Sequence, residues 1–320
     1  MYTWAMPSPV PLAVGHAPGK FILCGEHAVV YGRPAIAAPL FQLQAQAVVY
    51  PDRECLVVAV DIDRWVRVAA APADDPFARV VRLVCAELER PLPPWRIEVR
   101  SEIPIASGLG SGAAIATATA RGLLAAFGAA LPVERLSALV YEVEKLHHGT
   151  PSGIDNTVVV YGRPVWFVRG QALEPFVPGA TLHLLIGDTG IASPTRLVVG
   201  DVRRGWEADH GRYEALFDGV DAIVTRARTC IEAGDVMALG KLLDQNQALL
   251  DEMGVSSPEL DRLVTAARGA GALGAKLSGG GRGGNMIALV APGSEETVRE
   301  ALLAAGAKRV FGAEMAGEAG

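Results

Sequence analysis

Hydrophobic and polar positions alternate with a period of two in several parts of this chain. Between Trp95 and Ser101 apolar residues alternate with charged ones, which predicts a strand with one buried and one solvated face. Residues 41–71 show a similar alternation and predict antiparallel strands with one wet face. More continuously apolar segments predict strands at 20–24, after Pro34, at 164–168 and at 182–186.

Apolar residues at helical spacing fill other segments, and the first of these starts at Asp75-Pro76. A proline directly after an aspartate suits the first turn of a helix, and the apolar stripe continues to Leu88. A second proline-started helix is predicted from Pro132 to about His148. The second half of the chain predicts helices at about 219–233, 235–253 and 257–270, then strands at 275–278, 285–290 and 308–315 with a helix from Ser294 between the last two.

A polar connector at 169–180 separates a half with many strands from a half dominated by helices. We therefore expect two domains, residues 1–180 and residues 181–320, with the boundary near Ala180. The order strand, loop, strand, helix, strand at the end of the second half predicts a compact α/β layer.

A glycine-rich segment, IPIASGLGSGAAIATATARGLL at 103–124, directly follows the strand that ends at Ser101. The chain after Gly112 is rich in Ala, Thr and Leu and has no proline, so the loop is expected to open into a helix. The free N–H groups of that helix would point back at the loop, where glycines allow close approach of a ligand. Such a loop favours phosphate.

Two common phosphate motifs do not fit this loop. A P-loop requires a lysine where Ala113 and Ala114 stand. A dinucleotide fingerprint has its third glycine at the position of Ala113, and no acidic residue follows at the distance needed to bind a ribose. The loop is expected to bind phosphate in another way; the alternative is a helix start that packs tightly against a sheet.

Composition and charge limit the possible partners. The chain has 320 residues, 50% of them hydrophobic, and a net charge of −6 from 35 acidic and 29 basic residues. Without a long run of either sign, this composition argues against nucleic acid or an anionic membrane as the main partner. The most apolar run, 112–131, is interrupted by Arg121 and is better explained by a buried helix than by a membrane span.

The expected compartment is a reducing cytoplasm. Four cysteines, which are Cys24, Cys55, Cys85 and Cys230, have spacings that match neither a zinc site nor a disulfide framework. No positive residue precedes Lys20, so the first residues do not have the pattern of a secretory signal.

Charged side chains in apolar surroundings mark a candidate site in the segment 14–40. Lys20, Glu26 and His27 lie at the ends of predicted buried strands, where an ionic group requires a partner or a ligand. Taken singly, Lys20 could be an exposed lysine at a strand edge and His27 a core histidine with satisfied hydrogen bonds.

Further candidates lie near the end of the second helix. Glu144 borders the apolar stripe, where it is either a solvated flank or a ligand for a cation. The following turn, PSGIDN, contains Ser152 and Asp155, either of which could cap the next helix. In GGGRGG, residues 279–284, five glycines in six residues predict close approach of backbone to a ligand rather than a mere hairpin. Because several polar clusters fall at element ends, we expect one shared site.

Three of these stretches resemble the three motifs of the GHMP kinases, the family of galacto-, homoserine, mevalonate and phosphomevalonate kinases. They are residues 17–29 with APGK and GEHAV, residues 104–114, and residues 276–281 with KLSGGG. A fourth stretch, 144–156, is most similar to the branch that phosphorylates the primary alcohol of mevalonate with ATP. The resemblance covers about residues 14–315. It implies an α/β two-domain fold with an N-terminal mixed sheet and helices and a C-terminal ferredoxin-like α/β layer.

The resemblance also implies roles for individual residues. Asp155 would be the base facing the substrate hydroxyl, and Lys20 the cation beside it; Glu26 and His27 would lie on the substrate side. Glu144 and Ser111 would hold Mg²⁺. The ATP phosphates would be bound by Pro104, Ile105, Ala106, Ser107, Gly108, Leu109, Gly110, Ser111, Gly112, Ala113 and Ala114, with Gly279, Gly280 and Gly281 closing over them.

The family further implies ATP and Mg²⁺ as cofactors, mevalonate as the substrate, a role in isoprenoid precursor synthesis and a homodimer. The chain departs from the family pattern in the phosphate loop, where two adjacent serines are usual and Ser111-Gly112 stands here. Either Ser111 supplies the metal ligand or water does, since Mg²⁺ readily keeps several waters. Arg282 and Asn285 also differ from the plainer glycine motif, and contact with nucleotide or substrate is the expectation for them.

Other functions remain alternatives at this point. Another kinase of the family would act on phosphomevalonate or a sugar. A non-catalytic sensor on the same fold should have lost Lys20, Glu144 or Asp155, and all three are present.

Overall fold

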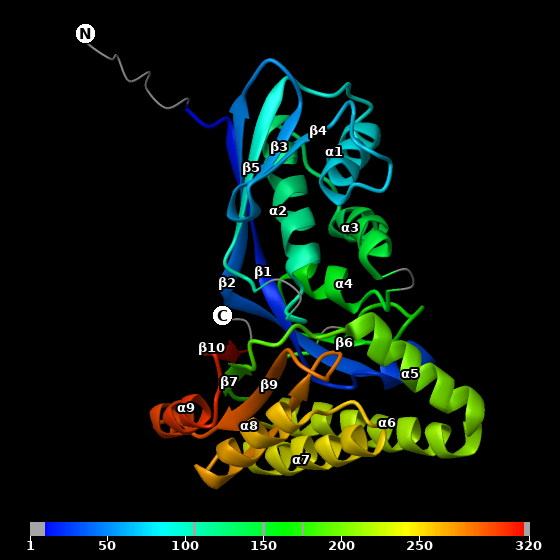
Figure 1. Ribbon diagram of the computed structural model, residues 1–320, viewed down its shortest axis with the longest axis vertical. Coiled ribbons are helices and arrows are strands. Elements are labelled where there is room, and N and C mark those ends of the chain that lie inside the picture. Colours follow the sequence, from blue (N-terminus) through cyan, green and yellow to red (C-terminus); the bar gives the residue numbers. More distant parts are fainter. Residues whose placement is uncertain (1–9, 105–106, 149–150, 175, 317–320) are drawn as a thin grey trace.

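Strands from the first and second halves of the chain form separate sheets that lie one above the other in an elongated molecule (Figure 1). The computed structural model describes residues 10–104, 107–148, 151–174 and 176–316. Strands between residues 13 and 167 form one sheet, and strands between 182 and 315 form the other.

The first sheet has the order β1-β2-β5-β3-β4, with β6 paired to one end of β2. Its strands are β1 Ala13–Cys24, β2 Ala35–Pro51, β3 Leu56–Ala59, β4 Arg64–Arg67, β5 Trp95–Ser101 and β6 Val165–Phe167. β3 runs parallel to β5, whereas the other neighbours described are antiparallel. The sheet is therefore mixed, as expected, and the alternation in 95–101 buries Ile97 and Val99.

Helices cover one face of this sheet. They are α1 Pro76–Glu87, α2 Ser111–Ala126, α3 Val133–His148 and α4 Ile154–Tyr161, and short 3-10 turns occur at η1 Ala28–Tyr31 and η2 Val60–Ile62. α1 begins as expected, because Asp75 Oδ1 accepts from the N–H of Ala78 at 2.8 Å. α2 packs so closely against β1 that a Cβ on Gly15 would collide with the carbonyl of Ala118.

The second sheet has the order β10-β7-β9-β8 with antiparallel neighbours. Its strands are β7 Leu182–Asp188, β8 Gly274–Ser278, β9 Asn285–Val290 and β10 Arg309–Met315, and its helices are α5 Thr195–Ala208, α6 His210–Ala233, α7 Val236–Glu252, α8 Pro258–Gly269 and α9 Glu295–Ala304. β7, the first of these strands in sequence, lies between β10 and β9, the last two in sequence. This is the ferredoxin-like order, and it confirms the expected fold of the second half of the chain.

The sequence pattern did not reveal α5 or the first half of α6. α5 has a narrow apolar stripe of Val198, Val202 and Trp206 at helical spacing, with mostly charged residues and glycines between them, and it was not predicted. α6 begins at Asp209, whose Oδ1 accepts from the N–H of Arg212 at 3.1 Å. Both segments depend on contacts with other elements, which a local pattern does not contain.

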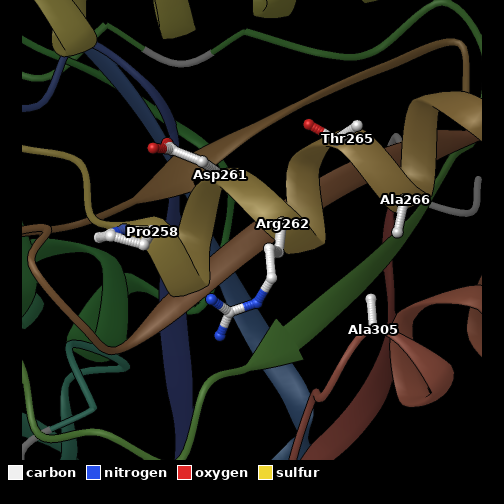
Figure 2. A pocket seen from close by; sticks show the side chains of 6 residues that line it. All are labelled: Pro258, Asp261, Arg262, Thr265, Ala266 and Ala305. Atoms are coloured by element: carbon white, nitrogen blue, oxygen red, sulfur yellow. The ribbon is translucent and has the colours of Figure 1, made fainter.

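Buried side chains of both sheets and of the helices that pack on them form one continuous apolar core. Within the described residues, no helix is long and apolar enough to cross a membrane. A shallow surface pocket of about 420 Å³ lies beside α8 and α9 (Figure 2). It is lined by Pro258, Asp261, Arg262, Thr265, Ala266 and Ala305, none of which the sequence placed in the candidate site.

Candidate functional site

Lys20 and Asp155 form an ion pair at the centre of the candidate site. Lys20 lies in the second half of β1 and Asp155 in the first turn of α4, and Lys20 Nζ is 3.0 Å from Asp155 Oδ1. The lysine side chain is 4% exposed and the aspartate 27%. Lys20 is therefore not an exposed edge lysine. Gly153, not Asp155, is the N-cap of α4, so the capping interpretation of Asp155 is wrong.

The phosphate loop packs directly against Lys20. The N–H of Lys20 donates to the carbonyl of Leu109 at 3.0 Å, and a Cβ on Gly110 would lie 2.8 Å from Lys20 Cγ. Gly110 is the left-handed N-cap of α2, with φ of 75°. Because glycine has no side chain to bond them, the first amides of α2 are available to an anion beside the lysine.

The residues of the phosphate loop differ in what they can offer a ligand. Ser107 is buried and its hydroxyl donates to the carbonyl of Pro104 at 2.9 Å. Leu109, Ala113 and Ala114 point into the core, so they could contact phosphate only through their backbone. Gly108, Ser111 and Gly112 are partly exposed. The expected ATP-binding residues Ile105 and Ala106 lie outside the described residues.

Glu144 is buried in α3, with 2% of its surface exposed. Burial and, to a smaller extent, the negative charge of Asp155 raise the pKa of its carboxyl to about 8 against the opposing charge of Lys20. The carboxyl therefore lies within electrostatic reach of the Lys20–Asp155 pair and is not a solvated flank. The carboxylates of Glu144 and Asp155 and the hydroxyl of Ser111 at the start of α2 are oxygen donors of the kind that Mg²⁺ prefers. Mg²⁺ also binds phosphate oxygens and water.

No group of three or more His, Cys, Asp or Glu side chains among the described residues could hold a metal by itself. A cation bound by Glu144 would thus depend on oxygens from a nucleotide, from Ser111 or from water. This donor set fits Mg²⁺, which usually binds through one or two carboxylates and substrate phosphates.

The segment 279–284 is the loop of the hairpin formed by β8 and β9, and the expected approach of a ligand to its backbone stays a prediction. Its glycines approach other parts of the protein. A Cβ on Gly280 would lie 2.6 Å from Thr195 Oγ1, one on Gly283 2.9 Å from the carbonyl of Ile191, and one on Gly281 would collide with the carbonyl of Val255. Gly279 has the most room in this loop, since a Cβ on it would lie 3.9 Å from the nearest atom, the carbonyl oxygen of Gly108.

This glycine loop is joined to the phosphate loop. Asn285 Nδ2 donates to the carbonyl of Ser107 at 2.6 Å, and Gly284 lies against the same carbonyl. Arg282 adopts a φ of 52°, and its guanidinium donates to the carbonyl of Gly254 at 3.0 Å and pairs with Asp201. Arg282 and Asn285 thus make contacts within the protein, and their expected contact with a ligand stays a prediction.

Glu26 forms a buried ion pair that the sequence did not reveal. Its Oε1 lies 2.5 Å from Lys276 Nζ, and the two side chains are 2% and 0% exposed. The same oxygen accepts from the N–H of Gly279 at 3.4 Å. Glu26 thus fixes the start of the glycine loop. The only sequence signal for Lys276 was a cation within an otherwise apolar strand.

His27 lies beside the glycine loop in a buried position. Its Nε2–H donates to the carbonyl of Gly280 at 3.2 Å. Burial lowers the pKa of the imidazole to about 4, with the Gly280 hydrogen bond opposing this shift and the charge of Lys276 adding to it. The ring is therefore neutral near pH 7. Nδ1 has no hydrogen-bond partner among the described residues, so the core-histidine interpretation accounts for only one ring nitrogen.

Comparison with known families agrees with this arrangement. Residues 76–163 match the family described as GHMP kinases N terminal domain, and residues 227–308 match GHMP kinases C terminal. The chain belongs to the GHMP kinase family.

Relatives that match over most of the chain include mevalonate kinases. The mevalonate kinase of Pyrococcus horikoshii is 34% identical, covering 93% of this chain and 94% of its own, and that of Aeropyrum pernix is 35% identical, covering 90% and 91%. The crystal structure of L. major mevalonate kinase in complex with R-mevalonate has a TM-score of 0.82 and 29% identity, and the match covers 98% of this chain and 100% of that one.

Proposed function

We propose that this protein transfers the γ-phosphoryl group of ATP to the primary hydroxyl of mevalonate, giving 5-phosphomevalonate. The Lys20–Asp155 pair beside the N-terminus of α2 carries the proposal, because it puts a cation and a proton acceptor next to an anion-binding helix end. The relatives named mevalonate kinase support this substrate. The similar L. major enzyme was crystallised with R-mevalonate.

Phosphoryl transfer requires in-line positioning and positive charge around the moving group more than covalent chemistry. In our proposal, Asp155 orients the acceptor hydroxyl and takes its proton. The ammonium group of Lys20 stabilises the charge on the transferred phosphoryl oxygens. Because Lys20 also packs against Gly110, the cation is held at the loop that would bind the phosphates.

We assign the nucleotide to the two loops. The amides of the loop 104–114, which includes the undescribed Ile105 and Ala106, would bind the ATP phosphates. Gly279, Gly280 and Gly281 would close over them from the second sheet. Room beside Gly279 and the link from Asn285 to Ser107 support a joint site for both loops.

Glu144 would hold Mg²⁺, with the Ser111 hydroxyl or a water as a further ligand. Bound Mg²⁺ would neutralise phosphate charge during the transfer. Because the pKa of the Glu144 carboxyl is raised to about 8, this group must lose a proton before it can bind the cation. His27 would face the substrate through Nδ1, and Glu26 would act on the substrate side through Gly279 and Lys276.

The division at residue 180 is part of the same proposal, with 1–180 as the phosphate-loop domain and 181–320 as the glycine-loop domain. It is supported by the two sheets, each formed from one side of that position. A homodimer in the cytoplasm is the expectation from the family, and light scattering of the purified protein would test the dimer.

A coupled assay tests the function directly. Purified protein with ATP and Mg²⁺ is given mevalonate, phosphomevalonate or galactose, and ADP release is followed while ³¹P NMR identifies the product. We expect 5-phosphomevalonate, with kcat/KM for mevalonate about a hundredfold or more above the other acceptors. Equal or greater turnover of phosphomevalonate or galactose would transfer the proposal to that kinase class, and no turnover of any acceptor would reject a kinase.

A further inference from the structure

The segment 189–208, which comprises α5 and the turn before it, connects two parts of the candidate site that are far apart in sequence. We call it the α5 strap. In Figure 1 it leads from the sheet of β7 to the long helix α6. Its residues have no role in the chemistry assigned above.

The first part of the strap lies on the glycine loop. The N–H of Thr189 donates to the carbonyl of Gly284 at 2.9 Å, and the N–H of Gly284 donates to the carbonyl of Ile191 at 2.7 Å. Ser193 Oγ donates to the carbonyl of Gly281 at 2.9 Å. Thr195 packs on Gly280 so closely that only glycine fits there. The strap therefore determines how the glycine loop is placed.

An ion pair fixes the middle of the strap. Asp201 pairs with Arg282, whose positive φ directs the side chain away from the loop and toward α5. The hydrogen bond from Arg282 lowers the pKa of the Asp201 carboxyl, and Arg204 adds to this effect. Exposed ion pairs of this kind contribute little to stability. We therefore attribute to the Asp201–Arg282 pair an effect on the position of the glycine loop.

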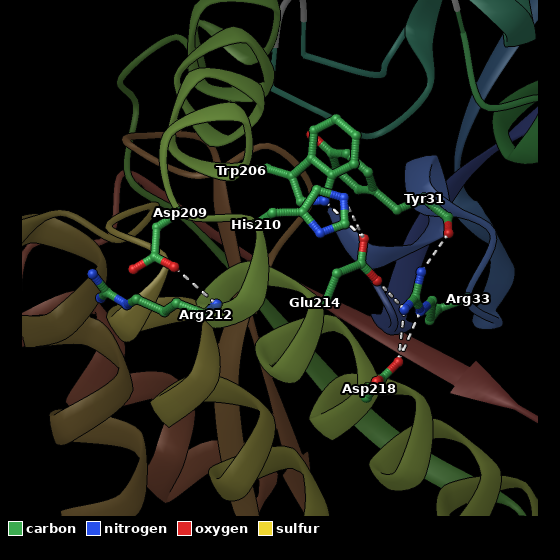
Figure 3. Close-up of polar contacts among 8 residues, drawn as sticks. All are labelled: Tyr31, Arg33, Trp206, Asp209, His210, Arg212, Glu214 and Asp218. Carbon is green, nitrogen blue, oxygen red and sulfur yellow. Dashed lines mark hydrogen bonds and ion pairs between the residues drawn. The ribbon is translucent and has the colours of Figure 1, made fainter.

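The end of the strap is fixed by a second set of contacts (Figure 3). Trp206 Nε1 donates to Glu214 Oε1 at 2.7 Å, and the other oxygen of Glu214 pairs with Arg33. Arg33 also pairs with Asp218 at 2.7 Å. The rings of Trp206 and Tyr31 lie with their centroids 5.4 Å apart. These contacts join α5 and α6 to the turn that follows η1.

Together the contacts form a closed path around His27. η1 begins directly after His27 and ends at Tyr31, which packs on Trp206. The strap then leads back to Gly280, whose carbonyl accepts the hydrogen bond from His27. A shift of α5 would therefore move the imidazole and the glycine loop together. Lys20 and the start of α2 lie outside this path.

We propose that Asp201, Arg282, Trp206 and Glu214 are positioning residues that hold the strap closed and thereby set the affinity of the site for the acceptor and for ATP together, because the glycine loop assigned to ATP is placed by the same contacts as His27. This inference rests on the proposed function, since it places the acceptor on the His27 side of the site.

Steady-state kinetics of Asp201→Asn and Glu214→Gln test the inference. We expect KM for mevalonate and KM for ATP each to rise about three- to tenfold in each variant, while kcat stays within twofold. Glu207→Gln is the matched control, because Glu207 pairs with Arg203 at 2.9 Å on the same helix without joining it to another element. The control should leave both KM values unchanged.

Arg282→Gly separates anchoring from backbone strain. Glycine relieves the positive φ but removes the ion pair, so we expect the same rise in acceptor KM as in Asp201→Asn without a fall in Tm. Unchanged KM values in all three variants, or a fall in kcat alone, would overturn the inference.

Failure of the two proposals can be told apart. A wrong function is visible in the unaltered protein, which would then turn over none of the acceptors or prefer another one. The strap can still be tested by hydrogen exchange. Asp201→Asn should accelerate exchange of the Thr189 and Gly284 amides several-fold, and Glu207→Gln should not. Equal exchange in both variants would reject the strap whatever the substrate.

Discussion

Lys20 Nζ lies 3.0 Å from Asp155 Oδ1, although the two residues belong to β1 and α4 at opposite ends of the first sheet's sequence. The contact brings opposite charges together where α2 begins. The lysine is almost fully buried and the aspartate is partly open. Because the buried ammonium of Lys20 holds it in place, the partly exposed carboxylate of Asp155 can contact a ligand without changing its position. The first prediction concerns this carboxylate.

Asp155→Asn should lower kcat by about 10² to 10⁴, because asparagine cannot accept the hydroxyl proton. ATP affinity should change by less than about threefold, since the phosphates are assigned to the loops. Stopped assays give kcat, and fluorescence titration with a nucleotide analogue gives the affinity. Glu142→Gln, which removes an exposed pair with Lys145 on α3, is the control. Near-normal turnover of Asp155→Asn would remove this residue from the mechanism.

Breaking the buried pair of Glu26 and Lys276 should cost stability. Lys276→Met leaves a buried carboxylate without its cation, and we expect the free energy of unfolding to fall by about 3–5 kcal/mol. The double variant Glu26→Leu, Lys276→Met should recover much of this loss, because no charge remains buried. Urea unfolding measures both changes. A single variant that loses less than about 1 kcal/mol would contradict the burial and pairing described above.

His27 predicts that stability falls in mild acid. Its folded pKa of about 4 lies below the ordinary value of 6.5, so the unfolded chain binds the proton first. The stability from this group is complete above pH 6.5 and is lost as the pH falls toward 4, by about 3 kcal/mol at most. Unfolding curves across this range should show the slope, and His27→Gln should flatten it. If the dependence of stability on pH is the same in His27→Gln, the acid sensitivity comes from another group.

Glu144 predicts the opposite dependence in alkaline solution. Its folded pKa is raised to about 8, so stability from this group is complete below pH 4.5 and is lost as the pH rises through 8. In the absence of Mg²⁺, Glu144→Gln should therefore be more stable than the unaltered protein at pH 9, on the order of 1–3 kcal/mol. The same variant should lose on the order of a hundredfold in turnover with Mg²⁺ and ATP. Normal turnover would exclude Glu144 as the metal ligand.

Strong local patterns predicted much of the fold. Asp75 and its proline located α1, and the alternation around Ile97 located β5. α5 was missed although Val198 and Val202 lie one turn apart, because this apolar stripe is narrow and the helix is held in place by distant partners such as Arg282. No local pattern could supply these partners.

The candidate site could be predicted in part for a similar reason. Lys20 and Asp155 were visible as charges beside apolar segments, and the structure confirms that they meet. The partner of Glu26 lies 250 residues away, and spacing gave no indication of it. At the glycines 280, 281 and 283, protein backbone and Thr195 occupy the space that a side chain would need, and the contact of this loop with a ligand stays a prediction.

The pairing of Glu26 with Lys276 also has a consequence for biosynthesis. A ribosome produces Glu26 early, and its cation becomes available only when the chain has been translated almost to the end. Until then, burial of Glu26 would leave its charge uncompensated, at a cost of several kcal/mol. Nascent or prematurely terminated chains that end before β8 therefore have no Lys276 to pair with Glu26, and this ion pair forms only once translation has passed the β8 strand.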